Sequence, residues 1–177
     1  MKKVSFLAVT AIAATMGLNS CSSDDPAQPL NVDWNQTATV HGKLLIRNDF
    51  VDATPKWTTA SDVKFVATVD YAQLASGAEG TYIVPGDKIT YDGRTGEVTV
   101  VFPVSRMGTQ LSLKLLDFTG SVKISDGNGG SKTVDVIWKG TPTSKTSDKM
   151  YPGDVGYLTN WQLQGYTQVV KEGDAIN

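Results

Sequence analysis

Apolar and polar side chains alternate along several short stretches of this 177-residue chain, and this period of two constrains the fold more than any other feature. Between residues 63 and 71 the odd positions are Val, Phe, Ala, Val and Tyr, whereas the even positions are Lys, Val, Thr and Asp. Such alternation is typical of a strand with one buried and one wet face. It also predicts strands at residues 97–102, 111–115 and 134–138, and further strands are expected at residues 39–46, 81–84, 88–91, 120–124 and 161–169.

Turn-forming residues separate these stretches, and no long helical pattern interrupts them. Residues 91–96 and 126–130 are rich in Gly, with Asp or Asn beside it, and these residues favour tight turns. The nearest approach to a helix is residues 71–78, which is short and closed by Gly77 and Gly80. Seven to nine short strands without alternating helices predict an all-β fold, an antiparallel Greek-key β-sandwich, with a small β-barrel as the alternative.

The first twenty residues have the layout of a secretory signal. Lys2 and Lys3 precede the uncharged, largely apolar stretch 4–18, which is too short for a membrane span because a span needs about 20 residues. Residues 18–21, Leu-Asn-Ser-Cys, resemble the lipobox of bacterial lipoproteins, although the Asn departs from the commonest pattern. The resemblance implies that Cys21 carries a diacylglycerol and becomes the first residue after cleavage. The alternative is an ordinary Cys21 thiol behind a simple signal peptide.

A short acidic segment follows the cysteine. Its residues resemble the export signal of Bacteroidota-type surface lipoproteins, and they are Ser22, Ser23, Asp24 and Asp25. The resemblance implies display on the outer face of the outer membrane, and the alternative is the periplasmic face of that membrane. Residues 21–36 are polar, contain two Pro and lack periodicity, so we interpret them as a lipidated flexible tether. The alternative for the part around Trp34 is contact with the β domain. The chain thus divides into a signal peptide (1–20), the tether (21–36) and a β domain (37–177).

Composition excludes several classes of protein and site. The chain has 16 basic and 18 acidic residues, and removing Lys2 and Lys3 with the signal leaves 14 basic residues and a net charge of −4. This balance argues against a general nucleic-acid binder, which carries a basic excess. One Cys cannot form an intramolecular disulfide or a multi-Cys zinc site, and one His excludes metal sites that need two imidazoles.

The β domain contains three short motifs, residues 38–44 (ATVHGKL), 91–100 (YDGRTGEVTV) and 115–119 (LLDFT). They resemble the transthyretin-like, or carboxypeptidase-regulatory-like, β-sandwiches of bacterial surface lipoproteins. The resemblance covers about residues 37–140, leaves 140–177 outside, and implies a seven-stranded Greek-key sandwich without catalytic residues. Such domains usually serve as adhesion, glycan-contact or assembly modules.

Aromatic residues in polar segments are the best candidates for a binding surface. Trp57, Tyr151 and Tyr157 each lie among polar or turn-forming residues, so we expect them on loops. Rings in such places stack on sugars or anchor a protein interface. The alternative for an aromatic ring is packing in the core or against the last strand, which we expect for Trp138, Trp161 and Tyr166.

For the other residues that could take part in catalysis or metal binding, we expect a structural role. His41 lies in a predicted strand, and packing on that strand is its expected role because a catalytic His needs a nucleophile and an acid nearby. The run 126–130 lacks the closing acid of a calcium loop and is interpreted as a hairpin turn. A glycosidase needs two acids flanking a cleft, and the three Glu residues, at 79, 97 and 172, show no such pattern. Residues 81–85 are expected to form an edge strand that ends at Pro85.

The sequence therefore predicts a lipid-anchored surface lipoprotein of the outer membrane, a non-enzymatic binding or adhesion module that contacts a protein or glycan partner. We expect no cofactor, no metal site and no catalytic residue. One alternative is a small lipid-anchored hydrolase that acts on glycans or peptides. Another is a structural or assembly subunit of the cell envelope. The oligomeric state and the strand order stay open at this point.

Overall fold

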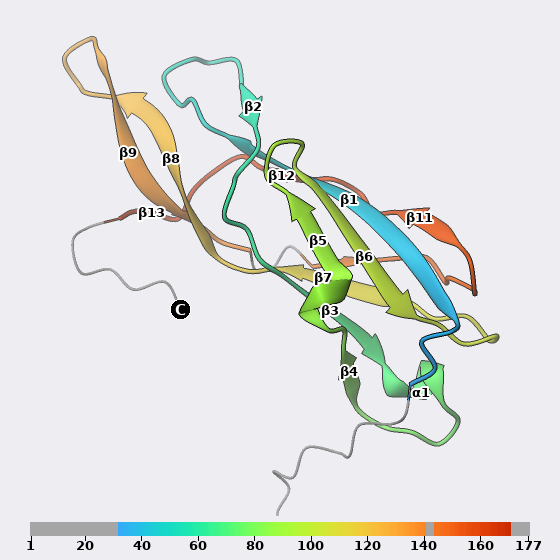
Figure 1. The fold of residues 1–177 in the computed structure, drawn as a ribbon. Coiled ribbons are helices and arrows are strands. Elements are labelled where there is room, and N and C mark those ends of the chain that lie inside the picture. Colours follow the sequence, from blue (N-terminus) through green and yellow to red (C-terminus); the bar gives the residue numbers. More distant parts are fainter. Residues whose placement is uncertain (1–31, 141–143, 171–177) are drawn as a thin grey trace, which may run out of the picture.

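The computed structural model describes residues 32–140 and 144–170 (Figure 1). The predicted lipidation and export residues lie outside the described residues; they are Cys21, Ser22, Ser23, Asp24 and Asp25. Within the described ranges thirteen strands form three sheets, accompanied by the short helix α1 (Tyr71–Leu74) and the 3-10 helix η1 (Gly86–Lys88). The prediction of an all-β sandwich is confirmed, and the barrel alternative is wrong because the sheets do not close on themselves.

The largest sheet has six strands and is built on the eleven-residue strand β1. Its members are β1 (Thr37–Arg47), β2 (Trp57–Thr58), β5 (Ile89–Asp92), β6 (Glu97–Pro103), β11 (Val155–Tyr157) and β12 (Trp161–Leu163). The four-stranded sheet contains β3 (Phe65–Asp70), β4 (Thr81–Ile83), β7 (Leu111–Leu115) and β10 (Lys145–Thr146). The third sheet contains β8 (Phe118–Ser125), β9 (Ser131–Trp138) and β13 (Gln168–Val169).

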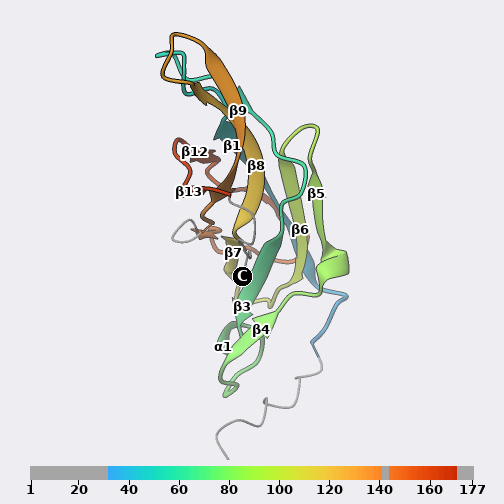
Figure 2. The same cartoon turned by 90° about the vertical axis from the view of Figure 1, so that its left-hand side faces the viewer.

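The core lies between the buried faces of the first two sheets. Alternate residues of β1 and β6 turn inward, as do those of β3 and β7, and together they form one continuous apolar cluster. A side view shows β5 and β6 in one layer and β3 and β7 in another (Figure 2). The alternation expected at residues 63–71 is confirmed, since Val63, Phe65, Ala67 and Val69 are all buried.

Two predicted segments change structure along their length. The strand expected at 63–71 ends at Asp70, whose carboxylate accepts a hydrogen bond from the backbone N–H of Ala72 (3.0 Å) and caps α1. The strand expected at 161–169 is two strands, because β12 pairs with β1 whereas β13 pairs with β9 in another sheet. The residues between them carry the chain from one sheet to the other.

Two C-terminal strands depart from the antiparallel pairing of the other described strands. Both β11 and β12 pair with β1 in parallel, with Thr39 opposite Val155 and Leu44 opposite Trp161. Because β1 has eleven residues and each partner only three, the two short strands pair with successive parts of β1. This arrangement places β11 at the edge of the six-stranded sheet.

Both predicted turns connect hairpins. Residues 126–130 join β8 to β9, and the Asp126 carboxylate accepts hydrogen bonds from the backbone N–H groups of Asn128 (2.8 Å) and Gly130 (2.9 Å). The 91–96 cluster joins β5 to β6 and ends at Gly96, which has a positive φ of 75°. Gly127 at the first turn has a φ of 83°.

These two glycines allow a matched test of how tightly the β5–β6 turn packs. A Cβ atom at Gly96 would lie 2.5 Å from the Leu44 carbonyl oxygen, whereas one at Gly127 would meet no atom within 4 Å. We expect Gly127→Ala to lower the free energy of unfolding by about 1–2 kcal/mol, the cost of a left-handed conformation. Gly96→Ala is expected to lower it by about 1–3 kcal/mol more because of overpacking. Urea denaturation of both variants checks this, and equal losses would contradict it.

Candidate functional site

The three predicted binding aromatics are exposed, but they lie in different settings. Trp57 is 36% exposed and belongs to the two-residue strand β2, where it pairs with Arg47, so its expected loop position is wrong. Tyr151 is 45% exposed and lies in a turn, where its backbone N–H donates to the Asp154 carboxylate (2.8 Å). Tyr157 is 80% exposed and ends strand β11, so it too lies on a strand and not on a loop.

The structure does not gather these three residues into one site. Trp57 pairs with β1 at Arg47, whereas Tyr157 pairs with β1 at His41. Six residues of extended chain span about 20 Å, so Trp57 and Tyr157 are separate surfaces. The rings expected to pack inside do so: Trp138 and Trp161 are buried, and Tyr166 packs partly buried against the core.

Tyr157 belongs to a row of outward-facing residues that crosses the six-stranded sheet. Residues in register on neighbouring strands point to the same face. Tyr157 of β11 is in register with His41 of β1, His41 with Thr99 of β6, and Thr99 with Thr90 of β5. We call this surface the outer face, and it also carries Lys43, Glu97 and Val101 from the adjacent positions of β1 and β6.

Side-chain contacts between neighbouring strands hold His41, at the centre of the row, in place. The Nδ1 atom of His41 and the Oγ1 atom of Thr99 lie 2.9 Å apart in a hydrogen bond. The rings of His41 and Tyr157 lie with their centroids 5.5 Å apart and their planes tilted by 30°. His41 is therefore a strand-packed imidazole, as expected, and it supports the exposed Tyr157 ring from one side.

Two hollows open on the outer face. The Tyr157 hollow, of about 410 Å³, is lined by His41, Gly42, Lys43, Glu97, Tyr157, Leu158 and Asn160. The Trp34 hollow, of about 680 Å³, is lined by Trp34, Thr37, Pro85, Asp87, Lys88, Thr90, Thr99 and Val101. Both volumes lie in the range of about 300–1,000 Å³ that is typical of ligand sites. The His41–Thr99 hydrogen bond joins a residue of one hollow to a residue of the other.

Trp34 is a site residue that the sequence analysis missed, because it lies in the segment interpreted as tether. Residues 33–36 form a turn that is tied to the domain by a hydrogen bond from Val104 N–H to the Gln36 carbonyl (2.9 Å). The Trp34 ring lies 6.4 Å from the Tyr82 ring, and Lys88 Nζ lies 5.6 Å from its centroid. A large aromatic residue in an otherwise polar tether was the available signal.

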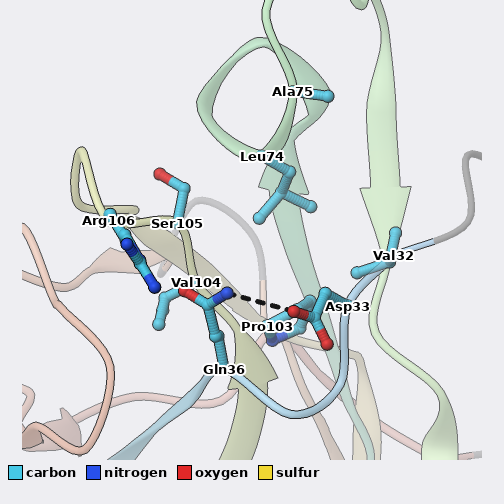
Figure 3. A pocket seen from close by; sticks show the side chains of 9 residues that line it. All are labelled: Val32, Asp33, Gln36, Leu74, Ala75, Pro103, Val104, Ser105 and Arg106. Carbon is cyan, nitrogen blue, oxygen red and sulfur yellow. Dashed lines mark hydrogen bonds between the residues drawn. The ribbon is translucent and has the colours of Figure 1, made fainter.

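A smaller pocket lies where the described chain begins (Figure 3). It holds about 230 Å³, and its lining includes Val32, Asp33, Leu74, Val104 and Arg106. The Gln36 side-chain amide donates a hydrogen bond to the Asp33 carboxylate (3.0 Å) at this pocket, and the backbone N–H of Asn35 is the main cause of a lowered Asp33 pKa. Its volume falls below the usual size of a ligand site.

Carboxyl groups with shifted pKa values all shift in the same direction. In five of them a backbone N–H is the main cause of the lowered pKa, and in Asp117 it is the hydrogen bond from Lys139; the six are Asp33, Asp49, Asp52, Asp92, Asp117 and Asp126. A lowered pKa favours the ionised form. A general acid needs the opposite shift, so these six groups are poorly suited to that role.

The three Glu residues and the expected edge strand were also considered in the sequence, and the structure places those that it describes. Glu79 lies exposed in the loop before β4, Glu97 begins β6, and Glu172 lies outside the described residues. Strand β4 is at the edge of the four-stranded sheet and carries the exposed Ile83, which confirms the expected edge strand. Across residues 32–140 and 144–170, no group of three or more His, Cys, Asp or Glu side chains is arranged to hold a metal ion.

In the described part of the chain, no helix is both long and apolar enough to cross a membrane.

Comparison with known proteins identified no relative of this chain. No protein-family model, no curated protein and no solved structure matches the chain.

Proposed function

We propose that the protein is a lipid-anchored lipoprotein of the outer membrane that is displayed on the cell surface and binds a partner without transforming it. The lipobox-like residues 18–21 and the acidic residues 22–25 support the anchor and the display. Two or three acyl chains at Cys21 hold a protein firmly at a membrane, because each buried methylene contributes about 0.8 kcal/mol. The outer face of the six-stranded sheet is the binding surface.

The observation that carries this proposal is the exposure of Tyr157. Tyr157 is 80% exposed, the highest exposed fraction among the exposed large hydrophobic residues of the described chain. It stands beside His41 in a hollow that also offers Lys43, Glu97 and Asn160 as hydrogen-bonding groups. An exposed ring surrounded by polar groups is typical of a recognition surface.

The position of the chain start suits a tethered module. The described chain begins beside α1, where Val32 shares a pocket with Leu74 and Ala75 (Figure 3). The β8–β9 hairpin projects from the opposite end of the molecule (Figures 1 and 2). Residues 21–31 number eleven and reach at most about 40 Å. An anchor at Cys21 would thus hold the α1 end of the domain within about 40 Å of the membrane.

Protease treatment of intact cells tests the proposed display. We expect protease to remove the domain from cells that carry the natural chain. Replacing Asp24 and Asp25 with Ala is expected to protect it until the outer membrane is broken, whereas Glu at both positions should preserve cleavage because the charge is kept. Protection of the natural chain in intact cells, with cleavage after rupture, would contradict surface display.

A further inference from the structure

We infer that the outer face binds a neutral oligosaccharide that crosses the strands from the Tyr157 hollow to the Trp34 hollow. This inference rests on the proposed binding function and names its ligand class. The two hollows, the aromatic ring in each, and the polar row between them are separate observations that point to one elongated site.

The dimensions of the face suit a chain of several sugars. The row Tyr157, His41, Thr99, Thr90 crosses four strands, which is three strand spacings. Neighbouring strands lie about 4.8 Å apart, so the row is about 14 Å long. The Trp34 hollow adjoins its Thr99 and Thr90 end, and the Tyr157 hollow adjoins its other end. A single sugar is too short to reach both hollows, whereas an oligosaccharide can occupy both.

The chemistry of the surface suits sugars. An aromatic ring offers a flat apolar surface for the C–H face of a pyranose, and the exposed Tyr157 and the half-buried Trp34 supply one ring at each end. Between and beside these rings, the side chains of Thr90, Thr99 and Asn160 supply hydroxyl and amide groups, which both donate and accept hydrogen bonds. Sugar hydroxyls also do both, so the two surfaces are complementary.

The paired charges in the two hollows favour a neutral ligand. Lys88 pairs with Asp87 (Nζ–Oδ2 3.1 Å) in the Trp34 hollow, and Lys43 stands in register opposite Glu97 in the Tyr157 hollow. Each cation of the two hollows thus has an acid beside it. A sulfated or uronic-acid chain would meet no net positive field, and complementary potential is what attracts a charged partner.

The same surface is a poor match for a protein partner. A stable protein interface buries about 800 Å² on each side around an apolar core. Among the large apolar side chains of the described residues that are exposed, β11 contributes Val155 and Tyr157, while Trp57 lies about 20 Å from Tyr157 along β1. Between Tyr157 and the Trp34 hollow, the row carries the imidazole of His41 and the hydroxyls of Thr99 and Thr90, with Val101 as an apolar neighbour, and this mixed surface favours the sugar.

Titration of the full chain, purified in detergent as its host processes it, tests the inference. The probes are hexasaccharides of glucose, xylose and mannose, the matching disaccharides, and a heparin-derived hexasaccharide as the acidic probe. We expect at least one neutral hexasaccharide to bind and the acidic probe not to bind. Tyr157→Ala is expected to weaken hexasaccharide binding at least tenfold. Trp57→Ala, which removes an exposed aromatic about 20 Å away along β1, should leave it unchanged.

Comparing disaccharides with hexasaccharides, and changing a residue of the Trp34 hollow, tests whether the binding site is elongated. Trp34→Ala is expected to weaken the hexasaccharide more than fivefold and to leave the disaccharide unchanged. If Trp34→Ala does not fold, the Thr90→Ala and Lys88→Ala variants replace it with the same expectation. Equal binding of natural chain and Tyr157→Ala, preference for the acidic probe, or no binding of any neutral probe would overturn the inference.

The experiments distinguish failure of the proposed surface display from failure of the proposed ligand class. A chain that protease removes from intact cells but that binds no neutral probe would keep the surface function and overturn the ligand class. A chain that binds a neutral hexasaccharide but resists protease in intact cells would keep the ligand class and overturn the surface display.

Discussion

Replacing Cys21 with Ser is expected to abolish attachment of fatty acid to the protein and to stop cleavage of the signal. The cysteine sulfur is the proposed site of the diacylglycerol, and Ser offers a hydroxyl that is a far weaker nucleophile than a thiolate. The variant should therefore keep residues 1–20 and run as a longer chain. Metabolic labelling with a radioactive fatty acid, followed by gel electrophoresis, measures both effects.

Ser23→Ala is the matched control for this variant, because it changes a neighbouring hydroxyl and leaves the cysteine intact. We expect it to be labelled and cleaved like the natural chain. Label on the Cys21→Ser chain would show that the lipid lies elsewhere. A cleaved but unlabelled natural chain would favour the simple signal peptide, with Cys21 as an ordinary thiol.

Replacing Trp161 with Ala is expected to lower the free energy of unfolding by about 3–5 kcal/mol, the usual cost of removing a large buried ring. Trp161 is 1% exposed, lies in β12 and packs edge-on against Phe65 with centroids 5.6 Å apart. Its ring also fills the space above Gly42, where a Cβ atom would lie 2.8 Å from it. The substitution opens a cavity between the two sheets at the point where β12 pairs with β1.

Urea denaturation followed by circular dichroism, on a chain that starts at Ser22, measures this loss. Because a domain has about 5–15 kcal/mol of stability in total, the midpoint should fall sharply. Trp161→Phe keeps an aromatic ring and should lose less, and Trp57→Ala should also lose less because Trp57 is 36% exposed whereas Trp161 is 1% exposed. A midpoint for Trp161→Ala equal to that of Trp57→Ala would contradict the assigned role.

Strand positions were predictable because alternation is a local property. Each residue of a strand turns its side chain to the face opposite its neighbour's, so a buried face appears in the sequence as a period of two. The segments around Phe65, Leu113 and Val98 are strands in the structure as expected. The strands that escaped prediction, β2, β10 and β11, have only two or three residues, which is too short for a period to show.

The candidate site was predictable only in part. The exposure of Tyr157 and the strand position of His41 were expected, but their contact was not, because it joins β11 to β1 across most of the domain. Trp34 was missed because a turn at residues 33–36 looks like a tether when its hydrogen bond to Val104 is unknown. Both errors arise at contacts between segments that are distant in the chain.

The sequence by itself determined the all-β class and the inward face of each long strand, because these depend on residues within one turn or strand. The tertiary structure alone decided which strands pair, in which direction and with which residues opposite. Parallel pairing of β11 and β12 with β1 depends on the length of β1 and on the burial of Trp161 beside Leu44. That pairing brings Tyr157, His41, Thr99 and Thr90 into one row, and no local pattern encodes it.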